Sequence, residues 1–399
     1  MEIGPILSAL RRHKLAAGLL VLEIAVACAI LCNAVFMIRQ RLAEMQVHTG
    51  LAENGLVWLM TDGVSGDDAT PVTERNLVAL RGIAGVQSAV TVVSLPLSNN
   101  SMNFNPSMDV DGTKHGPNAQ LMLGSPGYLQ TLGLKLVEGR DFDADEYAGM
   151  EVWLPQSSSM IVTRALAGRL WPGKDALGQV FWIGKRRFQV IGVVDHMVRG
   201  ELRGTASEYV ALFAARPASA LSALYVLRTD PASRDRVLRQ AADKLMALNP
   251  QMLINDKGTY TGLRDHYFAG DRAMAWLLAT VCVALLVVTA LGIGGLASFW
   301  VAQRRKQIGV RRAIGATRRD ILRYFQTENF LIVTGGVVLG MALAYAINLL
   351  LMAHYELPRL PASYFPIGAL ALWTIGQLAV LGPALRASRV PPVVATRSV

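Results

Sequence analysis

The chain has 399 residues, of which 52% are hydrophobic and 17% are charged, and its formal net charge is +10. Soluble domains carry about 45–50% apolar and about 25% charged residues, so this composition excludes intrinsic disorder and disfavours a wholly soluble enzyme. The positive total would indicate nucleic-acid binding only if the charges gathered on a soluble region.

Four long apolar runs divide the chain, at residues 15–38, 273–302, 330–353 and 366–385. Each has the length of about 20 residues that a helix needs to cross the hydrocarbon core of a membrane. The first run is longer than the roughly 7–15 residues of a signal-peptide core, and it is therefore predicted to be an uncleaved anchor. The sequence thus predicts four transmembrane helices.

The segments between these runs differ in charge. The positive surplus lies in the N-terminus 1–14, the loop 303–329 and the tail 386–399, whereas the loop 354–365 is neutral and region 39–272 has equal numbers of acidic and basic residues. Basic residues mark the cytoplasmic side of a membrane protein. We therefore predict a bacterial inner-membrane protein with both termini in the cytoplasm and region 39–272 outside. With no basic patch on its large soluble region, nucleic acid is excluded as a partner.

The large external region shows both helical and strand patterns, and it has no cysteine with which to build a disulfide scaffold. The middle segment 95–205 would form a second lobe. The expected elements are helices at Thr73–Ile83 and Pro231–Leu248, strands at Arg187–Val194 and Tyr225–Thr229, and surface loops at Asn99–Pro106 and Gly112–Pro117. The predicted fold class is an α-helical membrane protein with four transmembrane helices plus an α+β extracytoplasmic domain inserted between helices 1 and 2.

Motifs for catalysis or metal binding are missing from the sequence. The segment 168–175 comes close to a P-loop, but Asp175 replaces the hydroxyl that would hold magnesium and Pro172 has no N–H for the phosphate cradle. The pair Asp195–His196 follows a strand, and we interpret the histidine as a strand-end residue. We therefore predict a chain with no catalytic residue, no metal site and no bound cofactor.

The loop 303–329 combines strong basic charge with small and apolar residues. Ile308, Arg311, Arg312 and Gly315 share one face of a helix by their spacing, and the run Gly315–Thr317 would end that helix while Thr317 caps the next one. The charge alone fits an orientation signal that also binds anionic lipid. The apolar residues between the charges favour docking to a cytoplasmic partner. The candidate contact residues are Arg304, Arg305, Lys306, Gln307, Ile308, Gly309, Arg311, Arg312, Gly315, Ala316 and Thr317.

Polar and small residues inside the spans are candidates for helix contacts. Glu23 and Asn33 interrupt the first apolar run, and an intramembrane acid is a functional candidate by default. For Glu23 we favour a hydrogen bond to a neighbouring subunit. Gly336, Gly340 and Ala344 recur every four residues, a spacing that lets membrane helices approach closely. The spacing fits packing within the subunit as well as packing in a dimer.

The second apolar run is longer than a span requires. Its 30 residues exceed the bilayer by about 15 Å as a straight helix. We therefore expect Arg264–Met274 to form a stalk outside the membrane, joined to the exit of the first span at Arg39–Met45.

Three stretches resemble the permeases of MacB/FtsX-type ABC transporters. The coupling segment KQIGVRRAIGATRRDILRYFQTENFLIV resembles the permease helices, and Ser125–Phe142 and Met160–Val194 resemble the MacB-like periplasmic core domain. The resemblance implies a transporter permease that works by mechanotransmission, with ATP and magnesium on a separate cytoplasmic ABC ATPase dimer. It implies that ATP hydrolysis by this partner is coupled to the export or extraction of an extracytoplasmic substrate. It also implies a second permease subunit, either a copy or a paralogue, and it is compatible with a periplasmic adaptor and an outer-membrane duct.

One position departs from the family pattern. Members commonly have Glu before the Ile-Gly pair, and here the residue is Gln307, which removes one negative charge from the coupling loop. The alternative function is that of an FtsX-like signalling subunit that regulates an external partner such as a cell-wall hydrolase. The MacB-like stretches of the external domain favour transport.

Overall fold

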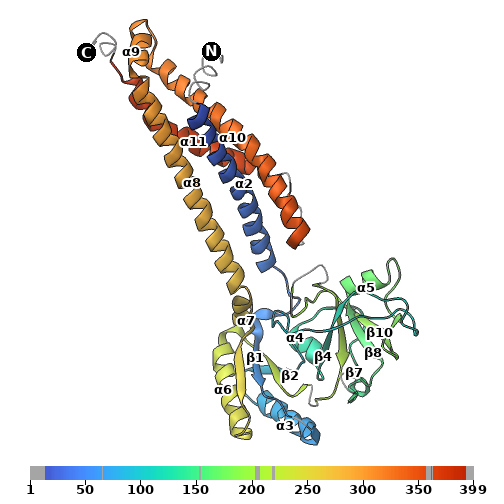
Figure 1. Cartoon of the computed structure of the whole chain (residues 1–399). Coiled ribbons are helices and arrows are strands. Elements are labelled where there is room, and N and C mark those ends of the chain that lie inside the picture. The colour runs from blue at the N-terminus through green and yellow to red at the C-terminus, as the bar shows by residue number, and fades with distance from the viewer. Residues whose placement is uncertain are drawn as a thin grey trace. The chain divides into compact units, whose positions relative to one another are not determined.

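The computed structural model describes residues 14–64, 66–151, 154–202, 207–217, 221–355, 361 and 363–391. The chain divides into two compact units (Figure 1). One unit contains the long helices, up to Gln46 and from Gly270 onward, and the other is Val47–Ala269. Most of the N-terminus 1–14, most of the loop 354–365 and the end of the tail 386–399 lie outside the described residues.

Four helices of the first unit are long and apolar enough to cross a membrane. They are α2 (Lys14–Met45), α8 (Ala269–Gln303), α10 (Arg318–Tyr355) and α11 (Tyr364–Ser388). Each contains one of the predicted apolar runs. The helices continue past those runs into polar sequence because helical hydrogen bonding does not depend on a membrane. The short helix α9 (Arg305–Ala313) joins α8 to α10.

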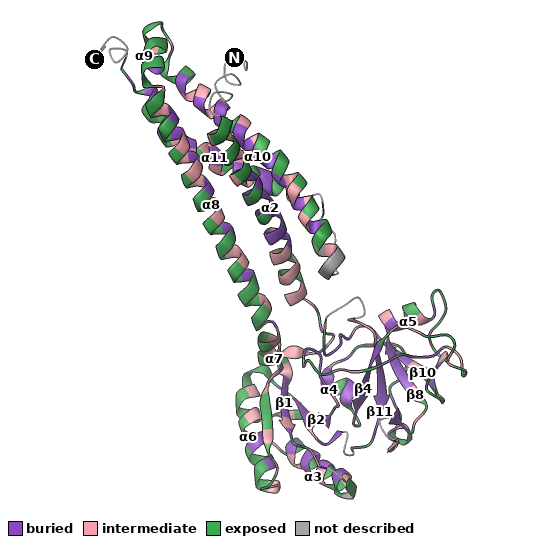
Figure 2. Cartoon of the chain, in the orientation of Figure 1, coloured by how far each residue is buried: buried purple, intermediate pink, exposed green. Residues whose placement is uncertain are grey.

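Close packing in this unit centres on α10, which lies along α2 and α11. Small residues allow the approach: a Cβ added to Gly340 would lie 2.5 Å from the Cβ of Cys28 on α2, and one added to Gly376 of α11 would lie 2.8 Å from Val333 of α10. Half of the most apolar window of α2 is buried, but only 17% of the corresponding window of α8. The mainly green ribbon of α8 in Figure 2 shows this exposure.

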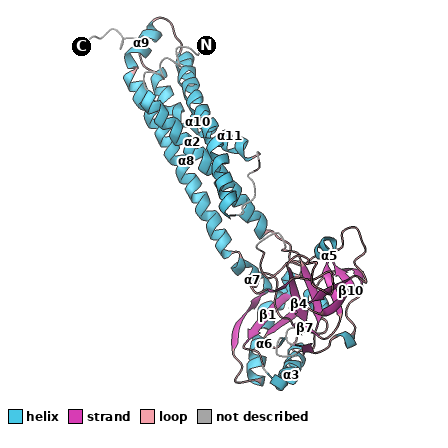
Figure 3. Ribbon diagram, turned by 45° about the vertical axis from the view of Figure 1, so that its right-hand side comes forward, coloured by secondary structure: helices cyan, strands magenta, loops and turns pink. Residues whose placement is uncertain are grey.

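The second unit contains two large β-sheets, which Figure 3 shows together with their covering helices, and one two-stranded sheet. The first is antiparallel with the strand order β13-β1-β12-β2, formed by β1 (Leu56–Thr61), β2 (Val86–Thr91), β12 (Leu224–Thr229) and β13 (Ile254–Thr259). The associated helices are α3 (Ala69–Arg81), α6 (Arg234–Leu248) and α7 (Tyr260–Tyr267). Leu77, Leu80, Val237, Ala241 and Leu245 of α3 and α6 form a buried cluster with β1 and β12.

The second sheet is mixed, and its sequence lies between β2 and β12. Its order is β3-β4-β11-β8-β10-β5, with β9 paired to β10. The strands are β3 (Met102–Phe104), β4 (Ala119–Gly124), β5 (Leu136–Gly139), β8 (Ser159–Thr163), β9 (Val180–Ile183), β10 (Arg186–Val194) and β11 (Val210–Ala214). The shorter elements are α4 (Tyr128–Leu132), α5 (Arg164–Leu170), the pair β6 (Met150–Glu151) and β7 (Leu154–Pro155), and the 3-10 turns Glu53–Gly55, Gly66–Asp68, Ala144–Glu146 and Pro231–Ser233.

The two sheets share one core. Trp58 and Val226 of the first sheet, Met122 and Ile161 of the second, and Tyr128 of α4 belong to the same buried cluster. The predicted second lobe therefore exists as a sheet of its own, but it does not separate from its neighbour. The four expected helices and strands are present with slightly shifted ends.

The expected loop Asn99–Pro106 is wrong in part, because its centre is strand β3. Met102 pairs with Leu121 and Phe104 with Ala119 in antiparallel register. Phe104 is buried in the core of the second sheet. Met102 and Phe104 alternate with polar residues as in a strand, but the turn-forming residues on either side favoured a loop.

An ion-pair network fixes the turn that follows β5. Glu146 accepts hydrogen bonds from both terminal nitrogens of Arg140, at 2.7 and 2.9 Å, from the backbone N–H of Asp143 at 2.8 Å, and from the hydroxyl of Ser159. The Arg140 guanidinium and these other donors lower the pKa of Glu146 to about 2. Each donor favours the charged carboxylate.

We expect Glu146→Gln to destabilise this domain at neutral pH. Because the pKa is lowered on folding, the stabilising effect is present above the ordinary value of 4.5 and is lost as the pH falls towards 2. The difference between variant and wild type in thermal unfolding should therefore shrink over that range. Glu138→Gln, at an exposed position in β5, is the matched control; an equal loss in both variants would contradict the prediction.

Candidate functional site

The segment between α8 and α10 folds as one short helix with defined ends. Gly315 has a φ of +104°, which suits the left-handed end of a helix, and the N–H of Ala316 bonds to the carbonyl of Arg311 at 3.0 Å. Thr317 and Asp320 then form a capping box: the N–H of Asp320 bonds to the Thr317 hydroxyl at 3.2 Å, and the N–H of Thr317 bonds to the Asp320 carboxylate at 2.9 Å. These caps give α9 and α10 sharp, separate boundaries.

One face of α9 packs into this chain's own helices. Ile308 is 4% exposed and belongs to the core cluster of the helical unit, and Gly309 is also buried. Both were predicted as contacts for a partner, yet the structure uses them for internal packing. The sequence suggested that this face could bind a partner, because it does not show which side of α9 the other helices of the chain cover.

The opposite face of α9 is exposed and carries an apolar pair within basic surroundings. The exposed fraction is 45% for Val310 and 82% for Ile314, and these residues are one helical turn apart. The predicted contact residues that are also exposed are Arg305, Lys306, Gln307, Arg311, Gly315 and Thr317, whereas Arg304, Arg312 and Ala316 are partly exposed. Val310 and Ile314 belong to the apolar residues noted between the charges, but they were not among the candidate contact residues, because the sequence does not show which of these residues the bundle leaves exposed.

Three arginines of this segment contact the helices beside it. Arg304 forms an ion pair with Glu328 of α10, with its Nη1 atom 3.0 Å from both carboxylate oxygens. The guanidinium of Arg311 lies 4.9 Å from the ring centre of Tyr324. Arg312 donates a hydrogen bond to the backbone carbonyl of Ser388 at the end of α11. Tyr324 and Glu328 were not predicted from the sequence. The signal that could have found Glu328 is its place as an acid just before an apolar run.

The small residues predicted for helix packing contact α2 of the same chain. A Cβ on Gly336 would lie 2.6 Å from Ile24, and one on Gly340 would lie 2.7 Å from the carbonyl oxygen of Ala25. Ala344 is fully buried. Asn33 donates to the carbonyl of Ala344 at 3.2 Å. The packing seen here is therefore within one subunit.

Glu23 was predicted to bond to a neighbouring subunit, and in this structure it faces another helix of its own chain. Its carboxylate lies against α8, where an oxygen would be 2.8 Å from a Cβ placed on Gly292. Gly292 thus provides the space that the carboxylate occupies. Glu23 is partly exposed, in contrast to Asn33, which is buried and lies nearly three helical turns further along α2.

Three polar contacts join the segments that enter the external domain to those that leave it. In the helical unit, Arg41 of α2 pairs with Asp271 of α8 at 2.9 Å. In the external unit, Arg264 of α7 pairs with Glu53 at 2.8 Å and donates to the carbonyl of Val47 at 2.7 Å. The expected continuous stalk Arg264–Met274 is wrong in one respect: Phe268 interrupts the helix between α7 and α8.

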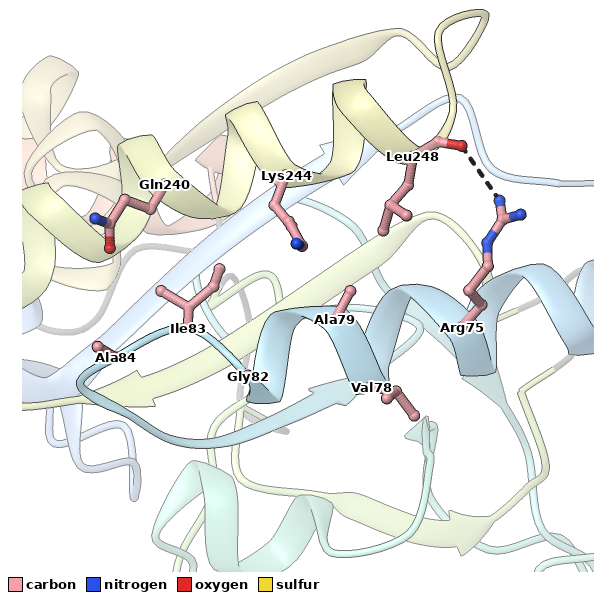
Figure 4. Close-up of a pocket in the computed structure, with 9 residues that line it drawn as sticks. All are labelled: Arg75, Val78, Ala79, Gly82, Ile83, Ala84, Gln240, Lys244 and Leu248. Atoms are coloured by element: carbon pink, nitrogen blue, oxygen red, sulfur yellow. Dashed lines mark hydrogen bonds between the residues drawn. The ribbon is translucent and has the colours of Figure 1, made fainter.

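A groove lies between α3 and α6 in the external unit (Figure 4). Its volume is about 660 Å³, and Val78, Ala79, Ile83 and Leu248 supply an apolar lining. Arg75 crosses one end and donates to the carbonyl of Leu248 at 3.5 Å. Among the described residues, no group of three or more His, Cys, Asp or Glu side chains could hold a metal ion.

Comparisons with known proteins identify both units. Residues 19–244 match the family model of the MacB-like periplasmic core domain, and residues 279–392 match that of the FtsX-like permease C-terminal region. The first match covers more than half of the chain.

Several relatives share these regions. The chain is 28% identical over 297 residues to the macrolide export ATP-binding/permease protein MacB 1/2 of Paracoccus denitrificans, covering 70% of this chain and 42% of that protein. It is 26% identical to the ABC transporter permease YknZ of Bacillus subtilis, covering 82% of this chain and 79% of that protein. The chain thus spans less than half the length of the MacB relative.

Solved structures give a consistent but weaker likeness. The periplasmic region of MacB from Actinobacillus actinomycetemcomitans superposes with a TM-score of 0.37 and 15% identity, covering 54% of this chain and 94% of that chain. The family assignment rests on the matches in sequence. The chain belongs to the MacB/FtsX-type permeases of ABC transporters, membrane proteins with four apolar helices and a periplasmic core domain between the first and the second.

Proposed function

We propose that this chain is a non-catalytic permease subunit that passes the motion of a separate cytoplasmic ATPase to its periplasmic domain. The observation that carries this proposal is the exposed pair Val310 and Ile314 on α9, whose other face is buried in the bundle. An apolar pair within a charged segment is typical of a protein docking surface. A helix fixed on one side and exposed on the other can pass a push from a partner into the spans.

The charge distribution supports the proposed orientation of the permease, with α9 on the cytoplasmic side of the membrane. The loop that contains α9 carries eight basic and two acidic residues, and it lies on the side predicted to be cytoplasmic. ATP and magnesium would then bind to the partner ATPase on that side. Both termini would lie in the cytoplasm of a bacterial inner membrane.

A second permease subunit, a copy or a paralogue, would complete the assembly. The large exposed apolar side chains on α8 offer a surface for either lipid or this subunit; they are Trp276, Leu277, Val281, Val283, Val287, Val288, Leu291 and Phe299. Two permeases and two ATPase subunits would form the core. An adaptor and an outer-membrane duct would extend it in a bacterium with two membranes.

The proposed substrate class comes from the name of a relative. A relative whose alignment covers 70% of this chain at 28% identity is named for macrolide export. We therefore propose an amphiphilic substrate of that kind, taken from the periplasmic side. The FtsX-like match of residues 279–392 keeps a signalling role as the second candidate. In that role ATP would change the activity of an external hydrolase, and no macrolide would move.

The test interrupts the connection between the membrane helices and the periplasmic domain. The junction insert places several glycines at both connections, after Gln46 at the end of α2 and between Asp265 and Gly270 at the α7–α8 junction, and it should abolish resistance to added erythromycin in a host that depends on this transporter. ATP hydrolysis by the isolated complex should remain. The same insertion in the exposed loop Gly112–Pro117 is the control and should preserve resistance. Full resistance with the junction insert would refute mechanical transmission, and a change in wall-hydrolase activity without resistance would favour signalling.

A further inference from the structure

The contacts of α9 indicate which span receives its motion. Arg304 stands immediately before the first residue of α9 and Arg311 lies in its last turn, whereas Tyr324 and Glu328 lie four residues apart on the same face of α10. Arg304 meets Glu328 and Arg311 meets Tyr324. These two contacts attach both ends of α9 to α10, and we call them the α9–α10 clamp.

The first contact is at the joint between two helices. The N–H of Arg304 bonds to the carbonyl of Trp300 at 3.0 Å, and its own carbonyl accepts from the N–H of Ile308 at 2.9 Å. Arg304 therefore ends the hydrogen bonding of α8 and begins that of α9. Its φ of −96° and ψ of 12° lie outside the helical range, so the chain changes direction at this residue.

The ion pair of this joint is buried. The side chain of Glu328 is 2% exposed and that of Arg304 is 12% exposed. Around Glu328 is a small cavity lined by residues of all four long helices, including Leu20, Trp300 and Val380. Burying an ion pair seldom adds stability over a well-packed apolar pair, but removing one partner leaves an uncompensated charge. The pair is thus better explained by the fixed geometry that it imposes than by stability.

From α10 a path of close contacts leads towards the periplasmic domain. Gly336, Gly340 and Ala344 of α10 pack on α2, where Asn33 bonds to the Ala344 carbonyl. The chain of α2 continues directly into the domain at Val47. By contrast, α8 buries little of its apolar surface against the other helices.

We infer that the α9–α10 clamp directs the motion of the coupling helix into α10 and from there into α2, with Arg304, Arg311, Tyr324 and Glu328 as positioning residues. This inference rests on the proposed function and names the route that the motion takes. The clamp makes α9 and α10 move as one body. Without it, α9 could turn at the joint with α8 while α10 stays in place.

The experiment measures an ATP-dependent movement in the complex isolated from host membranes through a tag on this chain. Spin labels on cysteines at Val78 of the periplasmic domain and Ile367 of α11, both exposed, report the distance between the two units. The complex is measured with ADP alone and again after ATP hydrolysis in the presence of vanadate, which takes the place of the released phosphate and traps ADP in the ATPase. The three native cysteines are buried.

The clamp is removed without burying a lone charge by the double variant Arg304→Met with Glu328→Leu. Arg304 is among the predicted contact residues, but in the structure its side chain is only 12% exposed and is paired with Glu328 inside the bundle, so it is not part of the exposed apolar pair. We therefore expect the double variant to retain the ATPase and hydrolyse ATP, but to lose the ATP-dependent change in distance. Arg323→Met is the control, because it removes a charge from an exposed position of α10 outside the clamp, and it should show the wild-type change.

The aromatic contact gives an independent pair of variants. Tyr324→Phe keeps the ring that faces Arg311 and should retain the change in distance, whereas Tyr324→Leu should lose it. A wild-type response in the double variant or in Tyr324→Leu would overturn the inference and leave the proposed function standing. No response in the wild type would overturn the proposed function itself, together with the route that depends on it.

Discussion

Replacing Val310 and Ile314 with glutamate is expected to abolish assembly with the ATPase and to leave the permease folded. Both side chains are exposed, so their replacement costs the isolated subunit about 0.5 kcal/mol or less. In the complex, two carboxylates would replace the apolar centre of the docking surface. Truncation of a hot-spot residue at the centre of an interface costs about 2 kcal/mol or more of binding free energy.

The measurement is co-purification of the ATPase with the tagged permease, together with thermal unfolding of the permease alone. Val110→Glu is the control, because Val110 is 59% exposed in a loop of the periplasmic domain. Ile308→Glu is a poor probe of docking, since it would bury a charge in the helical core and damage the fold. An ATPase that still co-purifies with the double glutamate variant would show that α9 docks through its charges alone.

Gly340→Leu is expected to disrupt the helical unit. Even a Cβ at this position would lie 2.5 Å from the Cβ of Cys28 and 2.7 Å from the backbone oxygen of Ala25, and a backbone cannot move aside as a side chain can. Overpacking of a tight core typically costs about 1–3 kcal/mol, and contact with backbone places this variant at the upper end. The expected result is a large fall in the temperature of unfolding in detergent.

Gly335→Leu is the matched control for this prediction. Gly335 is the neighbouring glycine on α10, is exposed, and has no atom within 4 Å of an added Cβ among the described residues. Leucine is also a better helix former than glycine by about 1 kcal/mol. The control should therefore unfold at the wild-type temperature or slightly above it. Equal losses in the two variants would mean that glycine is needed for helix geometry rather than for the contact with α2.

Much of the membrane unit could be predicted from the sequence because its signals are local. Apolar length and basic charge are properties of single segments, and they located the four spans and the short coupling helix. The caps at Gly315 and Thr317 were equally readable, since each acts within one turn of its own position. The family match in turn rests on stretches that are continuous in sequence.

The sequence could not show which residues far apart in the chain come together. Ile308 was predicted to contact a partner because its burial depends on helices that are distant from it in the sequence. The role of Glu328 depends on its ion pair with Arg304, 3.0 Å away in space but distant in the sequence. For the same reason β3 was expected to be a loop: a three-residue strand is recognisable only by its pairing with β4.

The pairing of β13 with β1 has a consequence for how this protein could be remodelled. The domain begins at Val47, ahead of β1, and ends at Ala269, after β13 and α7. The strands β1 and β13 are antiparallel neighbours in one sheet, with Val57 opposite Thr259, and Arg264 of α7 donates to the carbonyl of Val47. The points of entry and exit are therefore close together, the arrangement in which a domain can be inserted into a host chain with little disturbance. A permease scaffold of this design can accept a foreign domain between Gln46 and Gly270, so chimaeras that exchange this cassette would separate substrate choice from membrane assembly.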